Sequence, residues 1–246
     1  MMTLLHVQDV SGGYTRQPVI KDVSFTIEKH ELVGLIGLNG AGKSTTIKHI
    51  LGLLKPLKGE ILINGRNFDA DPTVYRSSLS YVPESPMIYD ELTLQEHLEM
   101  TALAYNIPEK DFKQRSEELM KTFRLYEKRN YFPSTFSKGM KQKVMIICSL
   151  IVQPELYIID EPFLGLDPIA INDLLEILKV EKEKGAGILM STHILSTAQI
   201  YCDSFIILHE GVIIAKGTLN ELQEQYKMPN ASLDEIYIFA TKEKSI

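Results

Sequence analysis

The sequence between Gly37 and Ser44 reads GLNGAGKS, which fits the pattern G-x-x-x-x-G-K-[ST]. Glycines let a loop curl close to phosphate oxygens, and the backbone N–H groups of such a loop form a nest for anions. Lys43 is expected to place its charge at the β- and γ-phosphates, and Ser44 to offer its hydroxyl to Mg²⁺. Residues 37–44, the phosphate loop, therefore predict a nucleoside triphosphate site.

The residues on either side of the phosphate loop support this interpretation. Residues 31–36 (ELVGLI) read as a buried strand, and residues 45–51 (TTIKHIL) read as a helix. A helix that follows the loop adds the positive end of its dipole to the site. This context disfavours the alternative, a glycine-rich turn that matches by chance. The residues expected to bind the nucleotide are Gly37, Asn39, Gly40, Ala41, Gly42, Lys43, Ser44 and Thr45.

Composition narrows the class of protein. The chain has 246 residues, and its 44% hydrophobic and 24% charged content is ordinary for a globular domain. A net charge of −6 disfavours a nucleic-acid binder with broad basic surfaces. Cys148 and Cys202 form neither a metal pattern nor a disulfide framework, so a reducing cytosol is expected. The N-terminus lacks the features of a signal peptide, and no apolar run approaches the roughly 20 residues that cross a bilayer.

The apolar pattern changes along the chain. Val23, Phe25 and Ile27 alternate with polar residues as in a strand, and Asn64-Gly65 is a hairpin signal. The pattern becomes helical from Thr93, where Thr93 and Glu96 match a capping box. The apolar runs at 156–159 and 188–191 have the composition of strands in a parallel sheet.

This succession predicts a single α/β domain with an inserted helical block. Residues 1–92 and 153–217 are expected to form the core with an antiparallel β-subdomain, and residues 93–152 the α-helical subdomain. The tail, residues 218–246, is expected to hold one short helix and a weak strand at residues 236–239.

An acidic pair follows the apolar run at 156–159. Asp160 can hold Mg²⁺, which prefers few direct carboxylates, and Glu161 can orient or deprotonate an attacking water. The alternative is an ordinary acidic turn at the end of a strand. The phosphate loop upstream favours the functional interpretation.

Residues 136–143 (FSKGMKQK) resemble the signature, usually written LSGGQ, of the ATP-binding cassette (ABC) family. Other segments resemble the family in the same order along the chain. Tyr14 matches the aromatic residue that stacks on adenine, and Glu84 occupies the place of the Q-loop glutamine. Residues 164–167 (LGLD) match the D-loop, and His193 matches the switch histidine that contacts the γ-phosphate.

The resemblance implies a P-loop NTPase fold with a RecA-like core, an N-terminal antiparallel β-subdomain and an inserted α-helical subdomain. It also implies an ATPase with ATP and Mg²⁺ as ligands. Lys43, Glu161 and His193 would be catalytic, and Ser44, Glu84 and Asp160 would hold the metal. Ser137 and Gly139 would bind the ATP held by a second subunit, either an identical copy or a related cassette.

Two positions depart from the family pattern. Lys138 replaces the first glycine of the signature and is expected to be a solvated side chain, the alternative being extra attraction for the γ-phosphate. Glu84 replaces glutamine; an ionised carboxylate can accept a hydrogen bond and meet Mg²⁺ but cannot donate.

The resemblance is strongest to the ATPase subunits of Ecs-type bacterial transporters, in residues 11–16, 136–143 and 160–168. It implies a subunit at the cytoplasmic face of the membrane, driving a separate multi-span permease, with export as the direction. The region from Tyr81 to Leu98 would touch that permease. A soluble ABC ATPase of the translation-factor or repair type is the alternative function. A P-loop kinase or GTPase is disfavoured because the signature, Asp160-Glu161 and His193 occur together.

Overall fold

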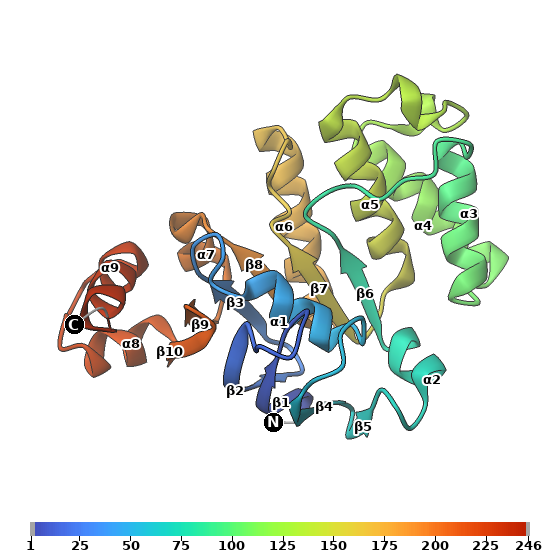
Figure 1. Cartoon of the computed structure of the whole chain (residues 1–246). Coiled ribbons are helices and arrows are strands. Elements are labelled where there is room, and N and C mark those ends of the chain that lie inside the picture. Colours follow the sequence, from blue (N-terminus) through green and yellow to red (C-terminus); the bar gives the residue numbers. More distant parts are fainter. Residues whose placement is uncertain (1–2, 245–246) are drawn as a thin grey trace.

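Two β-sheets form the framework of the chain (Figure 1). The computed structural model describes residues 3–244, with the side chains of residues 3–242. The smaller sheet is antiparallel, and its strands lie in the order β2 (Ile20–Glu28), β1 (Thr3–Gly12), β4 (Lys58–Ile63) and β5 (Arg66–Asn67). Asn64 and Gly65 join β4 to β5 with φ angles of 51° and 71°, as a two-residue turn of this kind requires. The predicted hairpin is therefore confirmed.

The larger sheet has six strands and carries the phosphate loop. Its order is β10 (Val212–Gly217), β9 (Ser204–His209), β3 (Leu32–Ile36), β8 (Gly187–Thr192), β7 (Leu156–Asp160) and β6 (Leu79–Val82). All neighbours pair in parallel except β9 and β10, which form an antiparallel hairpin. The carboxyl ends of β3, β7 and β8 consequently meet at one edge of the sheet, where α/β folds bind ligands.

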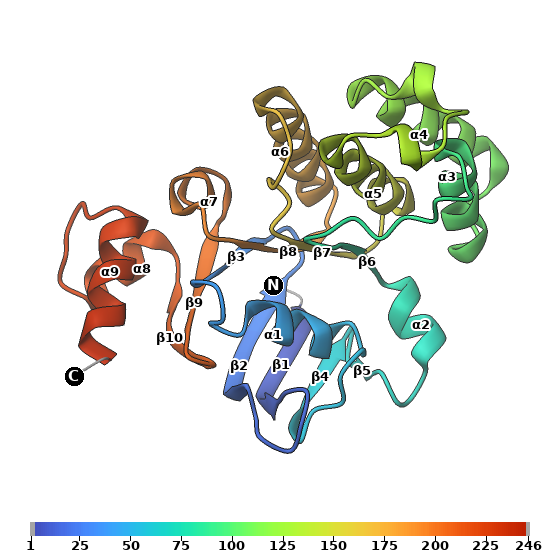
Figure 2. The same cartoon turned by 45° about the horizontal axis from the view of Figure 1, so that its top comes forward.

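Each strand of the larger sheet divides its side chains between two hydrophobic cores. On β3, Val33 and Leu35 pack against the antiparallel sheet, whereas Leu32 and Ile36 pack on the opposite face. The period of two along a strand explains this division. Helix α1 (Lys43–Ile50) lies between the two sheets, and its Ile47 is fully buried there (Figure 2). The start of α1 is thereby held rigidly at the sheet edge.

Helices cover the other face of the larger sheet. They include α5 (Lys138–Val152), α6 (Pro168–Glu183) and α7 (Leu195–Tyr201) (Figure 2). Helices α3 (Leu94–Ala104) and α4 (Glu109–Thr122) pack with α5 into a block, and the short α2 (Pro72–Ser77) precedes β6. The capping box predicted for Thr93 and Glu96 is confirmed at the start of α3. Among residues 3–244, no helix combines the length and apolarity needed to span a bilayer.

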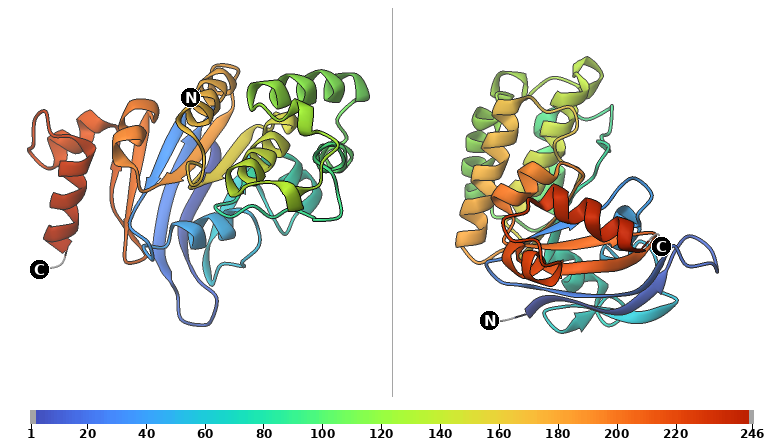
Figure 3. Two further views of the ribbon diagram at one scale, coloured as in Figure 1. Left: turned by 90° about the horizontal axis from the view of Figure 1, so that it is seen from above. Right: turned by 90° about the vertical axis from the view of Figure 1, so that its left-hand side faces the viewer.

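The tail differs from its prediction. It forms α8 (Leu219–Gln225), as expected, and then α9 (Leu233–Lys244), so the strand predicted at residues 236–239 is wrong. Leu233, Ile236, Tyr237 and Ala240 are buried, at the i, i+3, i+4, i+7 spacing of a helix. Ser232 also makes a capping box with Glu235, because each side chain accepts the other residue's N–H. Figure 3 shows α9 and the helical block at opposite ends of the molecule.

Candidate functional site

The phosphate loop joins β3 to α1 and presents the start of that helix to a cavity. Gly42 caps α1 with a φ of 107°, which favours glycine, and its position supplies no side chain to accept from the first N–H groups of the helix. A Cβ at Gly42 would lie 2.8 Å from Ile20 Cγ2 on β2, so the close packing also requires glycine. The N–H groups of the first helical turn have no intrahelical acceptor, so they can bind an anion.

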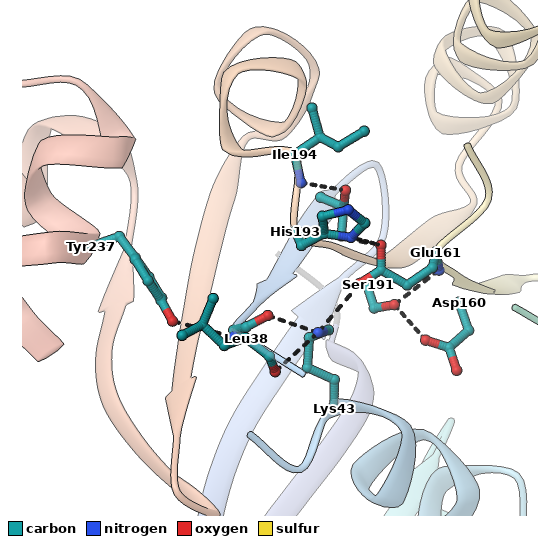
Figure 4. Close-up of polar contacts among 10 residues, drawn as sticks. Leu38, Lys43, Asp160, Glu161, Ser191, His193, Ile194 and Tyr237 are labelled. Atoms are coloured by element: carbon teal, nitrogen blue, oxygen red, sulfur yellow. Dashed lines mark hydrogen bonds and ion pairs between the residues drawn. The ribbon is translucent and has the colours of Figure 1, made fainter. Parts of the chain in front are cut away.

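Lys43 is the buried cation of the site. Its Nζ donates to the carbonyl oxygens of Gly37 at 2.7 Å and Leu38 at 3.4 Å (Figure 4). It also lies 3.3 Å from Glu161 Oε1, an ion pair that lacks hydrogen-bond geometry. Lys43 and Glu161 are 6% and 8% exposed at their side chains, so solvent screens this pair little. A phosphate that enters the loop would compete with Glu161 for the ammonium group.

The acidic pair lies where β7 ends beside β8. Ser191 on β8 donates its hydroxyl to Asp160 Oδ1 and accepts the N–H of Glu161 at 3.0 Å. His193 Nδ1 lies 2.7 Å from Glu161 Oε2 and donates to it, because a carboxylate only accepts (Figure 4). Glu161 has a φ of 47°, an uncommon backbone conformation for a residue other than glycine. The turn after β7 thus aims the Glu161 carboxylate at both Lys43 and His193.

These groups surround one cavity of about 580 Å³. Most of the predicted nucleotide residues line it, and so do Val19, Leu38 and Leu164. Those predicted from sequence that line the cavity are Tyr14, Asn39, Gly40, Gly42, Lys43, Ser44, Thr45, Glu84, Glu161 and His193.

Three predicted residues stand behind the wall of this cavity. Gly37 contributes its carbonyl to Lys43, and Ala41 is buried in the loop. Asp160 is 2% exposed and is held by Ser191. The oxygen atoms of Ser44, Glu84 and Asp160 are donors of the kind that Mg²⁺ prefers, so this set fits the predicted metal.

Tyr14 stands at the exposed rim of the cavity. Its side chain is 58% exposed, and Lys48 Nζ donates to its hydroxyl at 3.1 Å while lying 5.0 Å from the ring centroid. The hydrogen bond from Lys48 lowers the pKa of Tyr14. An open aromatic face at this position can stack on a flat base.

The signature segment, residues 136–143, forms the start of α5 and does not line this cavity. Ser137 is the N-cap of α5 and accepts the N–H of Met140 at 3.3 Å. Gly139 abuts the carbonyl of Gly165, where a Cβ would clash, and Lys143 Nζ donates to Asp167 Oδ2 at 2.7 Å. That bond lowers the pKa of Asp167 to about 2. The exposed Lys138 side chain agrees with the solvated interpretation, and neither Ser137 nor Gly139 lines the cavity.

Besides the apolar lining residues, two polar residues that support the site were not assigned from the sequence. Ser191 links Asp160 to the backbone of Glu161, and Lys48 orients Tyr14. Ser191 lies two positions before His193 at the end of an apolar run, so the strand prediction could have placed it beside Asp160. Lys48 lies one helical turn after Ser44, a spacing that gives no hint of Tyr14.

Comparison with known proteins agrees with this geometry. The family model described as ABC transporter matches residues 20–164. The ABC-type transporter ATP-binding protein EcsA of Bacillus subtilis (strain 168) is 59% identical over 242 residues, which cover 98% of each chain. The SkfA peptide export ATP-binding protein SkfE of the same organism is 35% identical over 224 residues, with 91% of this chain and 93% of SkfE covered.

The fold is shared with a solved structure described as the ATP binding subunit of an ABC transporter. It superposes with a TM-score of 0.95 at 56% identity, covering 97% of this chain and 100% of that one. The fold class and the family expected from the sequence are thus confirmed. The chain belongs to the ABC transporter family as an ATP-binding subunit, and it is an ATPase.

Proposed function

We propose that this subunit hydrolyses ATP between two cassettes and thereby drives a separate membrane permease, in the direction of export. One observation carries the proposal. The phosphate loop, Glu161 and His193 surround the cavity, whereas Ser137 and Gly139 at the start of α5 lie outside it. The start of α5 can therefore serve a nucleotide bound to another subunit, an identical copy or a related cassette, in a two-fold pair.

The residues of the cavity have distinct roles in this proposal. The phosphate loop and Lys43 bind the phosphates of ATP, and Tyr14 stacks on the base. Glu161 orients the attacking water and accepts its proton, and His193, held by Glu161 Oε2, faces the γ-phosphate. Ser44, Glu84 and Asp160 would hold Mg²⁺, which neutralises phosphate charge when it is bound.

The signature segment is connected to the catalytic strand within the chain. Residues 164–167 begin three positions after Glu161, and they contact α5 through the approach of Gly139 to Gly165 and the bond between Lys143 and Asp167. A change at the partner's nucleotide can therefore reach Glu161 through a short, packed segment. This contact supports a switch in which ATP closes the pair and hydrolysis opens it.

The proposed permease contact is the region from Tyr81 to Leu98, extended here along the rest of α3. Four large apolar side chains in this part of the chain are exposed: Met87, Tyr89, Met100 and Leu103 are 74%, 58%, 40% and 79% exposed. Exposed apolar side chains such as these are available to contact a partner. Docking there would hold the subunit at the cytoplasmic face of the membrane. Export is supported by the likeness to SkfE, whose name refers to peptide export.

Mixing two inactive variants tests the shared site. Lys43→Ala removes the phosphate-binding cation, and Ser137→Arg blocks the start of α5. If sites form between subunits, mixed pairs keep one intact site, and about a quarter of the native ATPase sites return on mixing. Circular dichroism of each variant verifies folding. If the mixture stays as inactive as its components, the shared site is wrong.

Purification from detergent-solubilised membranes tests the transport role. We expect the tagged subunit to bring down a multi-span membrane protein, and substitution of Met87 and Leu103 by serine to remove it. The alternative, a soluble ATPase of the translation-factor or repair type, predicts instead that the native protein sediments with ribosomes or stays free of membrane proteins.

A further inference from the structure

The C-terminal helix reaches the phosphate loop through a single hydrogen bond. Tyr237 on α9 points its hydroxyl toward the loop, and the N–H of Leu38 donates to Tyr237 Oη at 3.2 Å (Figure 4). These two residues lie 199 positions apart in the sequence. A contact of this range exists only because α9 folds back beside the carboxyl edge of the sheet.

This hydrogen bond acts on the peptide unit that also holds Lys43. The N–H of Leu38 and the carbonyl of Gly37 belong to the same planar peptide. The carbonyl accepts from Lys43 Nζ at 2.7 Å, while the N–H donates to Tyr237. Rotation of this peptide would break both bonds together. A donated N–H also polarises its peptide, which strengthens the carbonyl as an acceptor.

The tertiary structure fixes the Tyr237 hydroxyl. The Tyr237 side chain is 7% exposed, and its neighbours Leu233 and Ile236 on α9 are fully buried. The first turn of α9 is tied to α7, because the N–H of Leu233 donates to Gln199 Oε1 at 2.6 Å. Burial raises the pKa of Tyr237, so the hydroxyl stays neutral at working pH.

We propose that Tyr237 is a positioning residue for ATP binding: it fixes the Gly37–Leu38 peptide and so holds the Lys43 ammonium at the mouth of the phosphate loop. In this proposal α9 supports the phosphate loop through Tyr237, and α9 is itself held by α7, the helix that follows His193. This inference rests on the proposal that the phosphate loop binds ATP. It adds a residue of the tail to a site for which the sequence predicts none after His193.

The variant Tyr237→Phe removes the hydroxyl and keeps the ring. Loss of one net hydrogen bond predicts a rise of about 2- to 10-fold in the Kd for ATP with Mg²⁺, measured by calorimetry. KM for ATP should rise by the same factor while kcat stays within about 2-fold, because the bond supports ground state and transition state alike. Tyr226→Phe is the matched control, since its hydroxyl donates to Ile214 O in the same C-terminal segment.

Three outcomes would overturn the inference. Tyr237→Phe could bind ATP as tightly as the native protein, or it could lower kcat at an unchanged KM. Tyr226→Phe could weaken ATP binding equally, in which case general loosening of the tail is the cause. Failure of the native protein itself to bind ATP, with Lys43→Ala indistinguishable from it, would instead refute the assignment of the loop.

Discussion

Glu161→Gln should separate ATP binding from ATP hydrolysis in this subunit. The substitution keeps the shape of a buried side chain and removes its charge. In the native protein that charge faces Lys43 Nζ at 3.3 Å through Oε1 and His193 Nδ1 at 2.7 Å through Oε2. Two effects follow. The reaction loses its proton acceptor, and the phosphates of ATP no longer compete with a carboxylate for Lys43.

The sizes of both effects can be estimated. Loss of a general base lowers kcat by about 10²- to 10⁴-fold. At 3.3 Å the Glu161–Lys43 attraction amounts to about 5 kcal/mol at an effective dielectric constant near 20, before desolvation is counted. Desolvation of two buried groups offsets most of it, which leaves about 1–2 kcal/mol for a phosphate to overcome. Removing the carboxylate charge should therefore tighten ATP binding by about 5- to 30-fold.

Release of phosphate and calorimetric titration with ATP and Mg²⁺ measure the two effects. Size-exclusion chromatography should show the variant as an ATP-dependent pair that persists because turnover is slow. Glu155→Gln is the control, since it removes a carboxylate charge at a surface pair with Lys29. Hydrolysis within about 10-fold of native would exclude Glu161 as the base. Unchanged or weaker ATP binding would refute the competition for Lys43.

Three further predictions concern the neighbouring residues. Glu84→Gln should keep ATPase activity but shift its Mg²⁺ titration, because the amide is a weaker metal ligand than the carboxylate; an unchanged titration argues against a metal role. Gly139→Ala should leave ATP binding to the separated subunit's own phosphate loop intact and reduce hydrolysis at least about 10-fold, because its Cβ would clash with the Gly165 carbonyl and displace the segment after Glu161; native turnover would contradict this. Asp167→Asn keeps a side chain that can cap α6 but loses the ion pair with Lys143. In the native protein the hydrogen bond from Lys143 lowers the Asp167 pKa to about 2 from an ordinary value of 3.8. As pH falls, the Asp167 carboxylate is protonated in the unfolded state, with a pKa of 3.8, before it is protonated in the folded state, with a pKa of about 2. The stabilisation is therefore complete above pH 4 and is lost as pH falls toward 2. Urea unfolding at pH 6 and pH 3 should thus show a smaller difference between native and variant at the lower pH, and a difference independent of pH would refute the ion pair as its source.

Local patterns predicted most of the fold and the site. The hairpin at Asn64-Gly65 and the capping box at Thr93 depend on neighbouring residues, so they can be read from short windows. The same holds for the phosphate loop, where strand, glycines and helix adjoin in the chain. The strand prediction for residues 236–239 was wrong because four apolar residues in a row fit a strand as well as a helix. The spacing of Leu233, Ile236, Tyr237 and Ala240 carried the better signal.

The sequence by itself determined that a phosphate loop, an acidic pair and a histidine follow one another in an α/β chain of the ABC type. Only the tertiary structure decided which of these groups touch. Glu161 meets Lys43 and His193 because β3, β7 and β8 are neighbours whose carboxyl ends coincide. Tyr237 meets Leu38 because α9 folds back beside that same edge. Such contacts join residues far apart in the chain, and side-chain packing, which no local pattern encodes, sets their distances.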